Sequence, residues 1–280
     1  MAYPGKAKFK QGDPKVILNF ESVFKIVKKL GEGAFGLVVK VQDVSGKFYA
    51  MKMLKSFDDS AFQEIDALIG LNKYPQFKTS IVKYYDYFLY NQYLCILMEF
   101  IDGVEASKYF SKPFGLEDFL KFARWLTNTM AQLHKVDYVH RDIKPENIMV
   151  VKNGYKLIDF GLSCRTRLRD PLQCTKSVAG SPVYMSPELW YGYFQKNIFK
   201  YYKTSDNYAV GVTLYHILSN EFPYQIDREG RVIGKVYKDI QIQPRQYQGL
   251  NKLIHRMVYL NPDNRLTAAE SFNRLKEIKI

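Results

Sequence analysis

The strongest constraint on the fold of this 280-residue chain is a change of hydrophobic pattern near residue 100. Before it, β-branched and aromatic residues gather in short runs between turn signals, as in strands. After it, apolar residues recur three and four positions apart over long segments, which indicates helices. We therefore expect an α+β fold with a β-rich lobe over 24–101 and a mainly helical lobe over 102–280. Residues 1–23 are expected to be an N-terminal extension that packs on the domain.

The patterns also place the individual elements. Five strands are expected in the first lobe, at 27–30, 37–41, 48–54, 82–88 and 93–100. The segment 60–71 carries Ile65, Leu68 and Ile69 at helical spacing, so one face of that helix is expected to be buried. In the second lobe, helices are expected at 116–136, 205–219, 250–260 and 267–279, with short β-like pieces at 147–151 and 155–159.

Composition narrows the class of partner. Lys and Arg number 41 against 28 Asp and Glu, a net charge of +13. These cations are dispersed along the chain, which disfavours a nucleic-acid partner and leaves open either a lysine-rich surface or a preference for anionic partners. No apolar run is long enough to span a membrane, and the first residues lack a signal-peptide core. Three cysteines without a C-x-x-C pair favour reduced thiols. We expect a cytoplasmic protein, with nuclear access left open.

The segment Gly31-Glu-Gly33-Ala-Phe-Gly36 is a G-x-G-x-x-G motif. In dinucleotide-binding folds such glycines open a helix. Here a β-branched run, Leu37-Val-Val-Lys-Val, follows and predicts a strand. A glycine hairpin allows backbone N–H groups to approach phosphates closely, where a Cβ would obstruct them. A plain glycine turn is the alternative for this motif taken alone.

The most specific signal is His140-Arg-Asp142-Ile-Lys144-Pro-Glu-Asn147, followed by Asp159-Phe-Gly161. Together with the glycine motif, in this order, these segments closely resemble the eukaryotic protein kinases, over about 24–277. The resemblance implies a two-lobed fold with a five-stranded antiparallel sheet and a helix in the first lobe. It further implies that ATP binds in the cleft between the lobes.

The resemblance also implies roles for individual residues in binding ATP. Lys52 would pair the α- and β-phosphates, and Glu64 would hold that lysine, although twelve residues is a short spacing for this pair. Met98, Glu99 and Ile101 resemble the hinge that meets adenine. The full nucleotide-binding set comprises Leu30, Gly31, Glu32, Gly33, Ala34, Phe35, Gly36, Val38, Ala50, Lys52, Met98, Glu99, Ile101, Glu105 and Met149.

Physical chemistry supports the allocation of catalytic roles. Phosphoryl transfer needs positioning and charge stabilisation rather than covalent chemistry from the protein. Asp142 would accept or orient the acceptor hydroxyl, and Lys144 would offset charge on the transferred group. Asn147 and Asp159 supply the hard oxygen ligands that Mg²⁺ prefers. Further along, Ser186-Pro187-Glu188, Asp206 and Arg265 resemble residues that support the fold of kinases.

Acceptor and regulation follow from the same resemblance. Lys144 is the form typical of serine/threonine kinases, and Ser181 lies where such enzymes place a hydroxyl that bonds the catalytic aspartate and lysine. Basic residues between Asp159 and Glu188 favour acidic or already phosphorylated protein substrates; they are Arg165, Arg167, Arg169 and Lys176. Glu146 favours basic substrates instead, because it resembles a position at which some kinases hold a substrate arginine. Arg141 before the catalytic aspartate suggests activation by a phosphate on Ser177, with Thr175 as the alternative.

Three other functions are open at this point. A non-catalytic pseudokinase would lack an equivalent of Lys52, Asp142, Asn147 or Asp159, and none is missing. A small-molecule or lipid phosphotransferase would lack the set of Glu188, Asp206 and Arg265. Nucleic-acid binding through the basic surface would show as salt-dependent retention on DNA.

Overall fold

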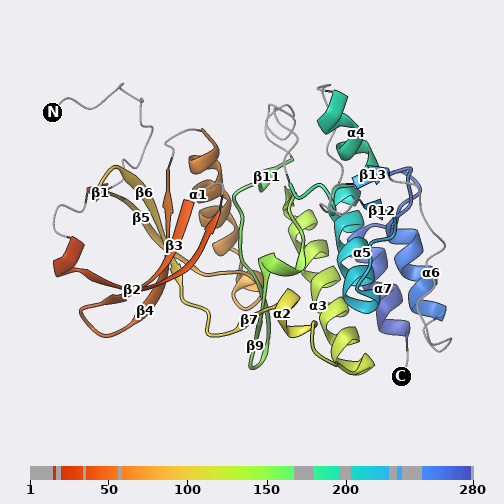
Figure 1. Cartoon of the computed structure of the whole chain (residues 1–280), viewed down its shortest axis with the longest axis horizontal. Coiled ribbons are helices and arrows are strands. Elements are labelled where there is room, and N and C mark those ends of the chain that lie inside the picture. Colours follow the sequence, from red (N-terminus) through yellow and green to blue (C-terminus); the bar gives the residue numbers. More distant parts are fainter. Residues whose placement is uncertain are drawn as a thin grey trace. The chain divides into compact units, whose positions relative to one another are not determined.

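The computed structural model describes residues 15–16, 20–33, 36–55, 59–166, 180–195, 203–226, 232–234 and 248–278. The chain forms two compact units (Figure 1). Unit 1 comprises Met1–Ile65 and Lys83–Ile101, and unit 2 comprises Asp66–Val82 and Asp102–Ile280.

Unit 1 is built on a sheet with the strand order β1-β5-β6-β4-β3-β2. The five expected strands are present and pair antiparallel, which confirms the expected sheet. The N-terminal extension adds one further strand at the edge, β1, which pairs parallel with β5. The strands are β1 (Lys15–Val16), β2 (Phe24–Gly33), β3 (Gly36–Asp43), β4 (Phe48–Leu54), β5 (Tyr84–Tyr90) and β6 (Tyr93–Glu99).

One face of this sheet forms the core of unit 1. Val39 and Val41 of β3 alternate with less buried neighbours and pack with Met51 and Met53 of β4. Phe20, from the short 3-10 helix η1 (Phe20–Ser22), closes the same cluster with Phe24, Phe88, Cys95 and Leu97. β2 is exposed along most of its length beyond Phe24. This edge strand carries lysines, a composition that discourages pairing with other chains.

Helix α1 (Asp59–Asn72) follows β4 after a short connection. Ile65 and Leu68 are buried as expected, whereas Ile69 is only half-buried. The residues of α1 up to Ile65 belong to unit 1, and the rest belong to unit 2. In unit 2, a Cβ at Gly70 would collide with the hydroxyl of Tyr138, so the absence of a side chain permits this contact.

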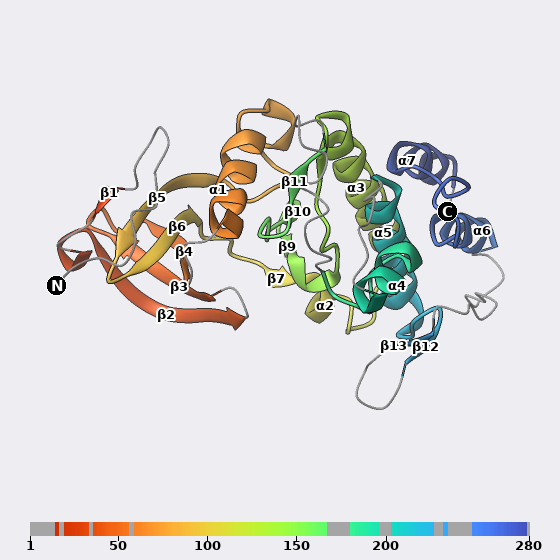
Figure 2. The ribbon, with the colours of Figure 1, turned by 90° about the horizontal axis from the view of Figure 1, so that it is seen from above.

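Unit 2 is mainly helical, as expected. Helices α3, α5, α6 and α7 pack together (Figure 2). α3 buries one apolar face, and α5 is buried on almost all sides over most of its length. The helices are α2 (Ala106–Tyr109), α3 (Leu116–Lys135), α4 (Pro187–Gln195), α5 (Lys203–Ser219), α6 (Gln248–Met257) and α7 (Ala268–Glu277).

Small sheets and 3-10 turns connect the helices of unit 2. One sheet has the order β10-β9-β7, β11 pairs with β8, and β12 pairs with β13. The remaining elements are η2 (Pro75–Phe77), β7 (Val104–Glu105), β8 (Tyr138–Val139), η3 (Pro145–Asn147), β9 (Ile148–Val151), β10 (Gly154–Leu157), β11 (Cys164–Arg165), β12 (Gln225–Ile226) and β13 (Val232–Gly234). Both β-like pieces expected near 147–159 are therefore strands.

Arg124 ties α3 to the end of α7. Its Nε donates to the carbonyl oxygen of Leu275 at 3.0 Å, and its Nη2 donates to that of Ile278 at 2.8 Å. Carbonyls at a helix C-terminus lack intrahelical partners, and a nearby cation satisfies them. These two bonds fix the end of α7 against α3.

Two observations bear on the sequence expectations. In the described part of the chain, no helix is both long and apolar enough to cross a bilayer.

The expectation that all three cysteines are reduced thiols is wrong, because Cys164 takes part in a disulfide. Cys95 is free and buried, and burial raises the pKa of its thiol to about 12. Cys174 lies outside the described residues.

Candidate active site

In unit 1, Lys52 on β4 meets Glu64 on α1. The Lys52 Nζ lies 2.7 Å from Oε1 and 2.8 Å from Oε2 of Glu64. Both side chains are buried, with the residues 7% and 3% exposed. A buried pair depends on each partner, because loss of one leaves an uncompensated charge in an apolar setting. The short spacing seen in the sequence therefore brings these two residues together after all.

The glycine motif forms the end of the β2–β3 hairpin. Gly33 pairs with Gly36 across the two strands. Gly36 has a φ of +153°, and a Cβ there would collide with the carbonyl oxygen of Met53, so only glycine fits. Glu32 on β2 pairs with Lys29 and Lys55 at the surface. Ala34 and Phe35, the other expected members of this loop, lie outside the described residues.

The expected hinge residues end the same sheet. Ala50 on β4 and Met98 on β6 are cross-strand partners. Glu99 is held in both directions: its N–H donates to the Lys83 carbonyl at 2.9 Å, and its carboxylate accepts from the Lys83 N–H at 2.7 Å. This fixes the chain just before Ile101, where unit 1 ends.

Glu105 and Met149 lie together in unit 2. They are register partners on β7 and β9, which places two of the expected nucleotide-binding residues side by side. Glu105 also forms an ion pair with Lys108 at 3.0 Å. Gly103, just before β7, leaves room for the Val150 carbonyl, which a Cβ would meet at 2.5 Å.

Asp142 is the centre of a hydrogen-bonded group in unit 2. Its Oδ1 accepts from the backbone N–H and the hydroxyl of Ser181, each at 2.9 Å. Its Oδ2 lies 2.9 Å from the Lys144 Nζ and accepts from the Asn147 Nδ2 at 2.9 Å. Lys144 also donates to the Ser181 hydroxyl at 2.8 Å. The contact expected between Ser181, the catalytic aspartate and the lysine is therefore present.

Asp206 binds the backbone of the two residues that precede Asp142. Its carboxylate binds the His134 Nε2 at 2.9 Å and accepts from the backbone N–H groups of His140 and Arg141 at 2.8 Å each. Burial alone raises the pKa of Asp206, but the bonds from His134 and His140 outweigh it and the pKa is lowered. Arg141 has a φ of +72°, an uncommon conformation for a long side chain. Asp206 holds it one residue before Asp142.

Asn147 and Asp159 offer oxygen donors for a metal ion. Both amide hydrogens of Asn147 point toward Asp142, since its Nδ2 donates to the backbone oxygen at 2.8 Å and to the carboxylate. The amide oxygen of Asn147 thus faces away from that group. Asp159 is half-buried, and its Oδ1 accepts from the Gly161 N–H at 3.2 Å. Mg²⁺ is commonly held by one or two protein oxygen ligands with substrate phosphates, which suits this pair.

No richer metal site competes with this pair in the residues that the structure describes. Among them, no group of three or more His, Cys, Asp or Glu side chains is placed to hold a metal ion.

Glu188 and Arg265 form the structural ion pair expected from the sequence. The guanidinium contacts both carboxylate oxygens at 2.9 Å, and the Ser205 hydroxyl adds a bond of 2.8 Å. Burial raises the pKa of Glu188, but the hydrogen bond and charge of Arg265 dominate and lower it. The pair joins the start of α4 to the loop before α7.

Comparison with known proteins agrees with this geometry. Residues 24–275 match the family described as "Protein kinase domain". The chain belongs to this family. It is 32% identical over 217 residues to Rho-associated protein kinase 1 of Homo sapiens, covering 73% of this chain and 15% of that protein. It is 26% identical over 276 residues to calcium-dependent protein kinase 27 of Arabidopsis thaliana, covering 91% of this chain and 55% of that protein.

Sequence reasoning missed two contributors to the site of this kinase domain. His134, at the end of α3, binds Asp206, and a histidine six residues before His140 was the available signal. Gly180 has a φ of +126°, and a Cβ there would lie 2.6 Å from the carbonyl oxygen of Arg141. Gly180 therefore lets the segment that carries Ser181 approach the backbone at Arg141.

The Glu188–Arg265 pair predicts a pH-dependent stability. Because the pKa of Glu188 is lowered on folding, the pair stabilises the domain above the ordinary glutamate pKa of 4.5 and loses that effect as pH falls through the folded value. Glu188→Gln should reduce the free energy of unfolding at pH 7 by about 3 kcal/mol. The difference from wild type should shrink below pH 4.5. Urea unfolding followed by fluorescence at several pH values measures this.

Glu117→Gln is the matched control. Glu117 pairs with Lys121 on the exposed face of α3 at 2.9 Å, and such surface pairs contribute little to stability. A Glu188→Gln deficit of the same size at pH 4 and pH 7 would contradict the prediction.

Proposed function

We propose that this kinase domain transfers the γ-phosphoryl group of ATP to serine or threonine hydroxyls of protein substrates. The observation that carries the proposal is the group formed by Asp142, Lys144 and Ser181. A carboxylate beside a lysine and a hydroxyl residue can accept a proton from an alcohol while the lysine offsets negative charge. The chain spans 15% and 55% of the two relatives compared above, so its activity and substrates are inferred from its own residues.

Asp142 is positioned before any substrate arrives. Its carboxylate is oriented by donors from Ser181, Lys144 and Asn147, so little reorganisation is needed when an acceptor hydroxyl binds. Asp142 then accepts the proton of that hydroxyl or orients it. Lys144 stabilises the charge on the transferred phosphoryl oxygens.

Lys52 and the glycine hairpin act on the nucleotide. Lys52 presents a compact positive charge to the α- and β-phosphates, and Glu64 fixes its position. The hairpin around Gly36 offers backbone N–H groups to phosphate oxygens. The backbone at Met98–Ile101 meets the adenine edge, and Glu105 binds the ribose.

Asn147 and Asp159 would hold Mg²⁺. Bound Mg²⁺ supplies positive charge to the phosphate oxygens and fixes their orientation. The two hydrogen bonds that the Asn147 Nδ2 donates to Asp142 set the direction of the Asn147 amide oxygen. The same residue therefore orients the carboxylate and presents a metal ligand.

Two alternatives are less well supported. A pseudokinase role conflicts with the presence of the Lys52–Glu64 pair and the ordered group around Asp142. A small-molecule or lipid phosphotransferase would not need the set of Glu188, Asp206 and Arg265, and here this set forms a connected support for the catalytic loop and α4.

Two substitutions test the catalytic assignment. Asp142→Asn should reduce phosphoryl transfer by at least about 100-fold while ATP binding persists, because the carboxylate acts on the acceptor. Lys52→Met should reduce turnover by a similar factor, because the phosphates lose their point charge. Transfer of labelled phosphate to a generic protein substrate and nucleotide binding are measured in parallel. Asp118→Asn, on the outer face of α3, is the control, and wild-type turnover in either active-site variant refutes its role.

The acceptor class is proposed to be acidic or phospho-primed peptides. Arg165 is exposed and stacks over the Tyr138 ring with its Cζ 5.7 Å from the ring centroid. Arg167, Arg169 and Lys176 lie outside the described residues. The opposing feature is the exposed carboxylate of Glu146. Burial raises the pKa of Tyr184, and the charges of Glu146 and Asp142 raise it further.

Matched peptides decide between these features. Peptides identical except for flanking Glu, phosphoserine or Arg should show kcat/KM about tenfold higher for the anionic versions, the size expected of one charge-assisted bond. Glu146→Gln should widen this preference. Better transfer to the Arg peptides would reverse the proposal.

Regulation is proposed to act through phosphorylation of Ser177, with Thr175 as the alternative. Both residues lie outside the described part of the chain. Support comes from Arg141, which immediately precedes the catalytic aspartate, and from Arg165 on β11. A phosphoserine carries about −1.5 to −2 charge and can take bidentate bonds from arginine. It would thereby order the segment that leads to Ser181.

Phosphatase treatment tests this mechanism. Phosphosites are mapped by mass spectrometry, and activity is compared for treated enzyme, Ser177→Ala and Thr175→Ala. Ser177→Ala and phosphatase should each lower activity, and phosphatase should not lower the variant further. Full activity in Ser177→Ala together with no phosphatase effect excludes the mechanism.

A further inference from the structure

Lys203, the first residue of α5, binds the connection between α3 and β8. Its Nζ donates to the carbonyl oxygen of His134 at 2.6 Å and to the Asp137 Oδ1 at 2.7 Å. The Asp137 side chain is 12% exposed and that of Lys203 is 39% exposed. A largely buried carboxylate is therefore held by a lysine that still reaches water.

Asp137 has a backbone conformation that needs support. Its φ is +63°, in the left-handed region that Asp and Asn tolerate better than most residues. This reversal joins the end of α3 to β8, which leads directly into the segment of His140 and Asp142. The Lys203 bond fixes the side chain of Asp137 at that reversal.

The backbone of Asp137 also holds Thr166. The Asp137 carbonyl oxygen accepts from the Thr166 N–H at 2.7 Å and from its hydroxyl at 3.1 Å. Next to this contact, β8 pairs with β11, with Val139 opposite Cys164 and Tyr138 opposite Arg165. The Asp137–Thr166 contact thus extends this short ladder by one position.

We propose that Lys203 and Asp137 are positioning residues for phosphoryl transfer. The ion pair holds Asp137 so that its carbonyl anchors Thr166, and this anchor sets where the chain after Asp159 runs relative to the catalytic loop. Both residues act through Thr166 rather than on the reacting groups, and the kinase resemblance of the sequence assigns neither of them a role. The expected effect on kcat rests on the proposed function, whereas the expected effect on hydrogen exchange at 161–166 does not.

Lys203 and Asp206 hold the same connection from one turn of α5. Asp206 binds the His134 ring and the backbone of His140 and Arg141. Lys203 binds the His134 carbonyl and Asp137. Residues three apart on a helix lie on one face. The Lys203 cation and the Asp206 anion therefore both bind the connection between α3 and the segment of His140 and Arg141. This explains how the N-terminus of α5 can control the geometry of two chain segments.

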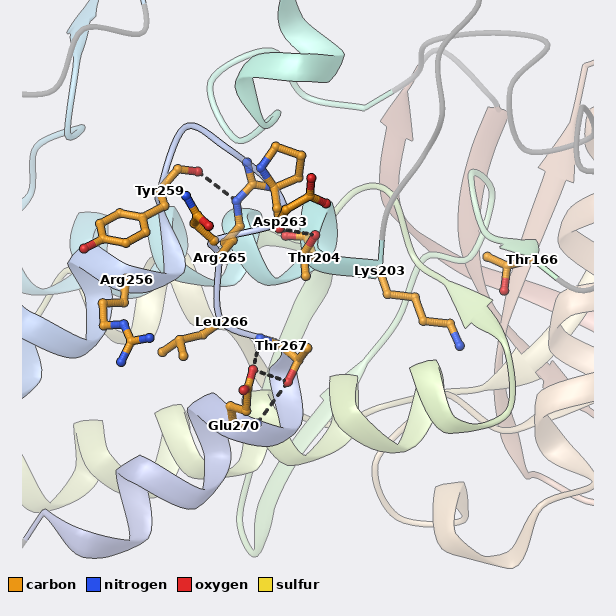
Figure 3. Close-up of a pocket in the computed structure, with 12 residues that line it drawn as sticks. Thr166, Lys203, Thr204, Arg256, Tyr259, Asp263, Arg265, Leu266, Thr267 and Glu270 are labelled. Carbon is orange, nitrogen blue, oxygen red and sulfur yellow. Dashed lines mark hydrogen bonds between the residues drawn. The ribbon is translucent and has the colours of Figure 1, made fainter.

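A cavity beside the ion pair makes the proposal testable. Lys203 and Thr166 both line a cavity of about 940 Å³ that extends to Thr204, Arg265 and Glu270 (Figure 3). The Asp137 side chain is itself 12% exposed and Lys203 lines the cavity, so replacing Lys203 does not leave the Asp137 carboxylate sealed from solvent. Lys203→Met is therefore expected to fold. Asp137→Asn is expected to fold too, because Asn keeps the left-handed conformation.

The experiment compares Lys203→Met, Lys203→Arg, Asp137→Asn and the double variant Asp137→Asn/Lys203→Met. Lys203→Met and Asp137→Asn should each lower kcat by about tenfold with the KM for ATP unchanged, a loss typical of displaced catalytic groups. The double variant should match the single ones, because both remove the same pair. Lys203→Arg should recover most of the activity. Lys121→Met on the surface of α3 is the matched control.

Hydrogen exchange gives a readout independent of activity. A peptide covering 161–166 should exchange faster in Lys203→Met and Asp137→Asn than in wild type, while a peptide covering α7 should not. Unchanged exchange at 161–166 overturns the anchor. Unchanged kcat in Lys203→Met, in an active wild-type background, overturns the catalytic consequence. If wild type transfers no phosphate, the proposed function fails, and the exchange data still decide whether Lys203 holds Thr166.

Discussion

The bonds of the buried Asp206 carboxylate are the interaction on which the proposed catalytic loop depends. A fully buried anion is stable only when donors replace the water it has lost. Here the His134 ring and the backbone amides of His140 and Arg141 do so. The same bonds hold the backbone at Arg141, whose φ is positive. The residue immediately before Asp142 is therefore tied to an anion in the core of unit 2.

The support of Asp142 continues on its other side. Ser181 donates two bonds to the carboxylate, and Gly180 allows that segment to lie against the Arg141 carbonyl. The residues before Glu188 and the catalytic loop thus share hydrogen bonds. The Glu188–Arg265 pair then fixes the end of that segment on the helical core. The bonds to Asp142 and the Glu188–Arg265 pair therefore hold the two ends of the segment 181–188.

Sequence patterns predicted the strands, the long helices and the chemistry-bearing motifs, because those signals are local. The Lys52–Glu64 pair was predicted from resemblance, and its short spacing is accommodated because α1 begins soon after β4 ends. β1 was missed because a two-residue strand has no periodicity, and its pairing is with the backbone of β5. The four-residue α2 was missed for the same reason.

Sequence reasoning also missed Arg124, Lys203 and Asp137, because their partners are backbone oxygens or distant residues, which no spacing reveals. The cysteine expectation failed because pairing depends on folded geometry rather than on a local motif.

The tight approach at Gly180 limits which residues could ever replace it during evolution. Any side chain at 180 would collide with the carbonyl oxygen of Arg141, the residue that precedes Asp142. Ser181 is similarly bound to Asp142 through its backbone and hydroxyl. Position 180 therefore cannot vary by itself, because any replacement of Gly180 would need a compensating change in the backbone at Arg141 at the same time.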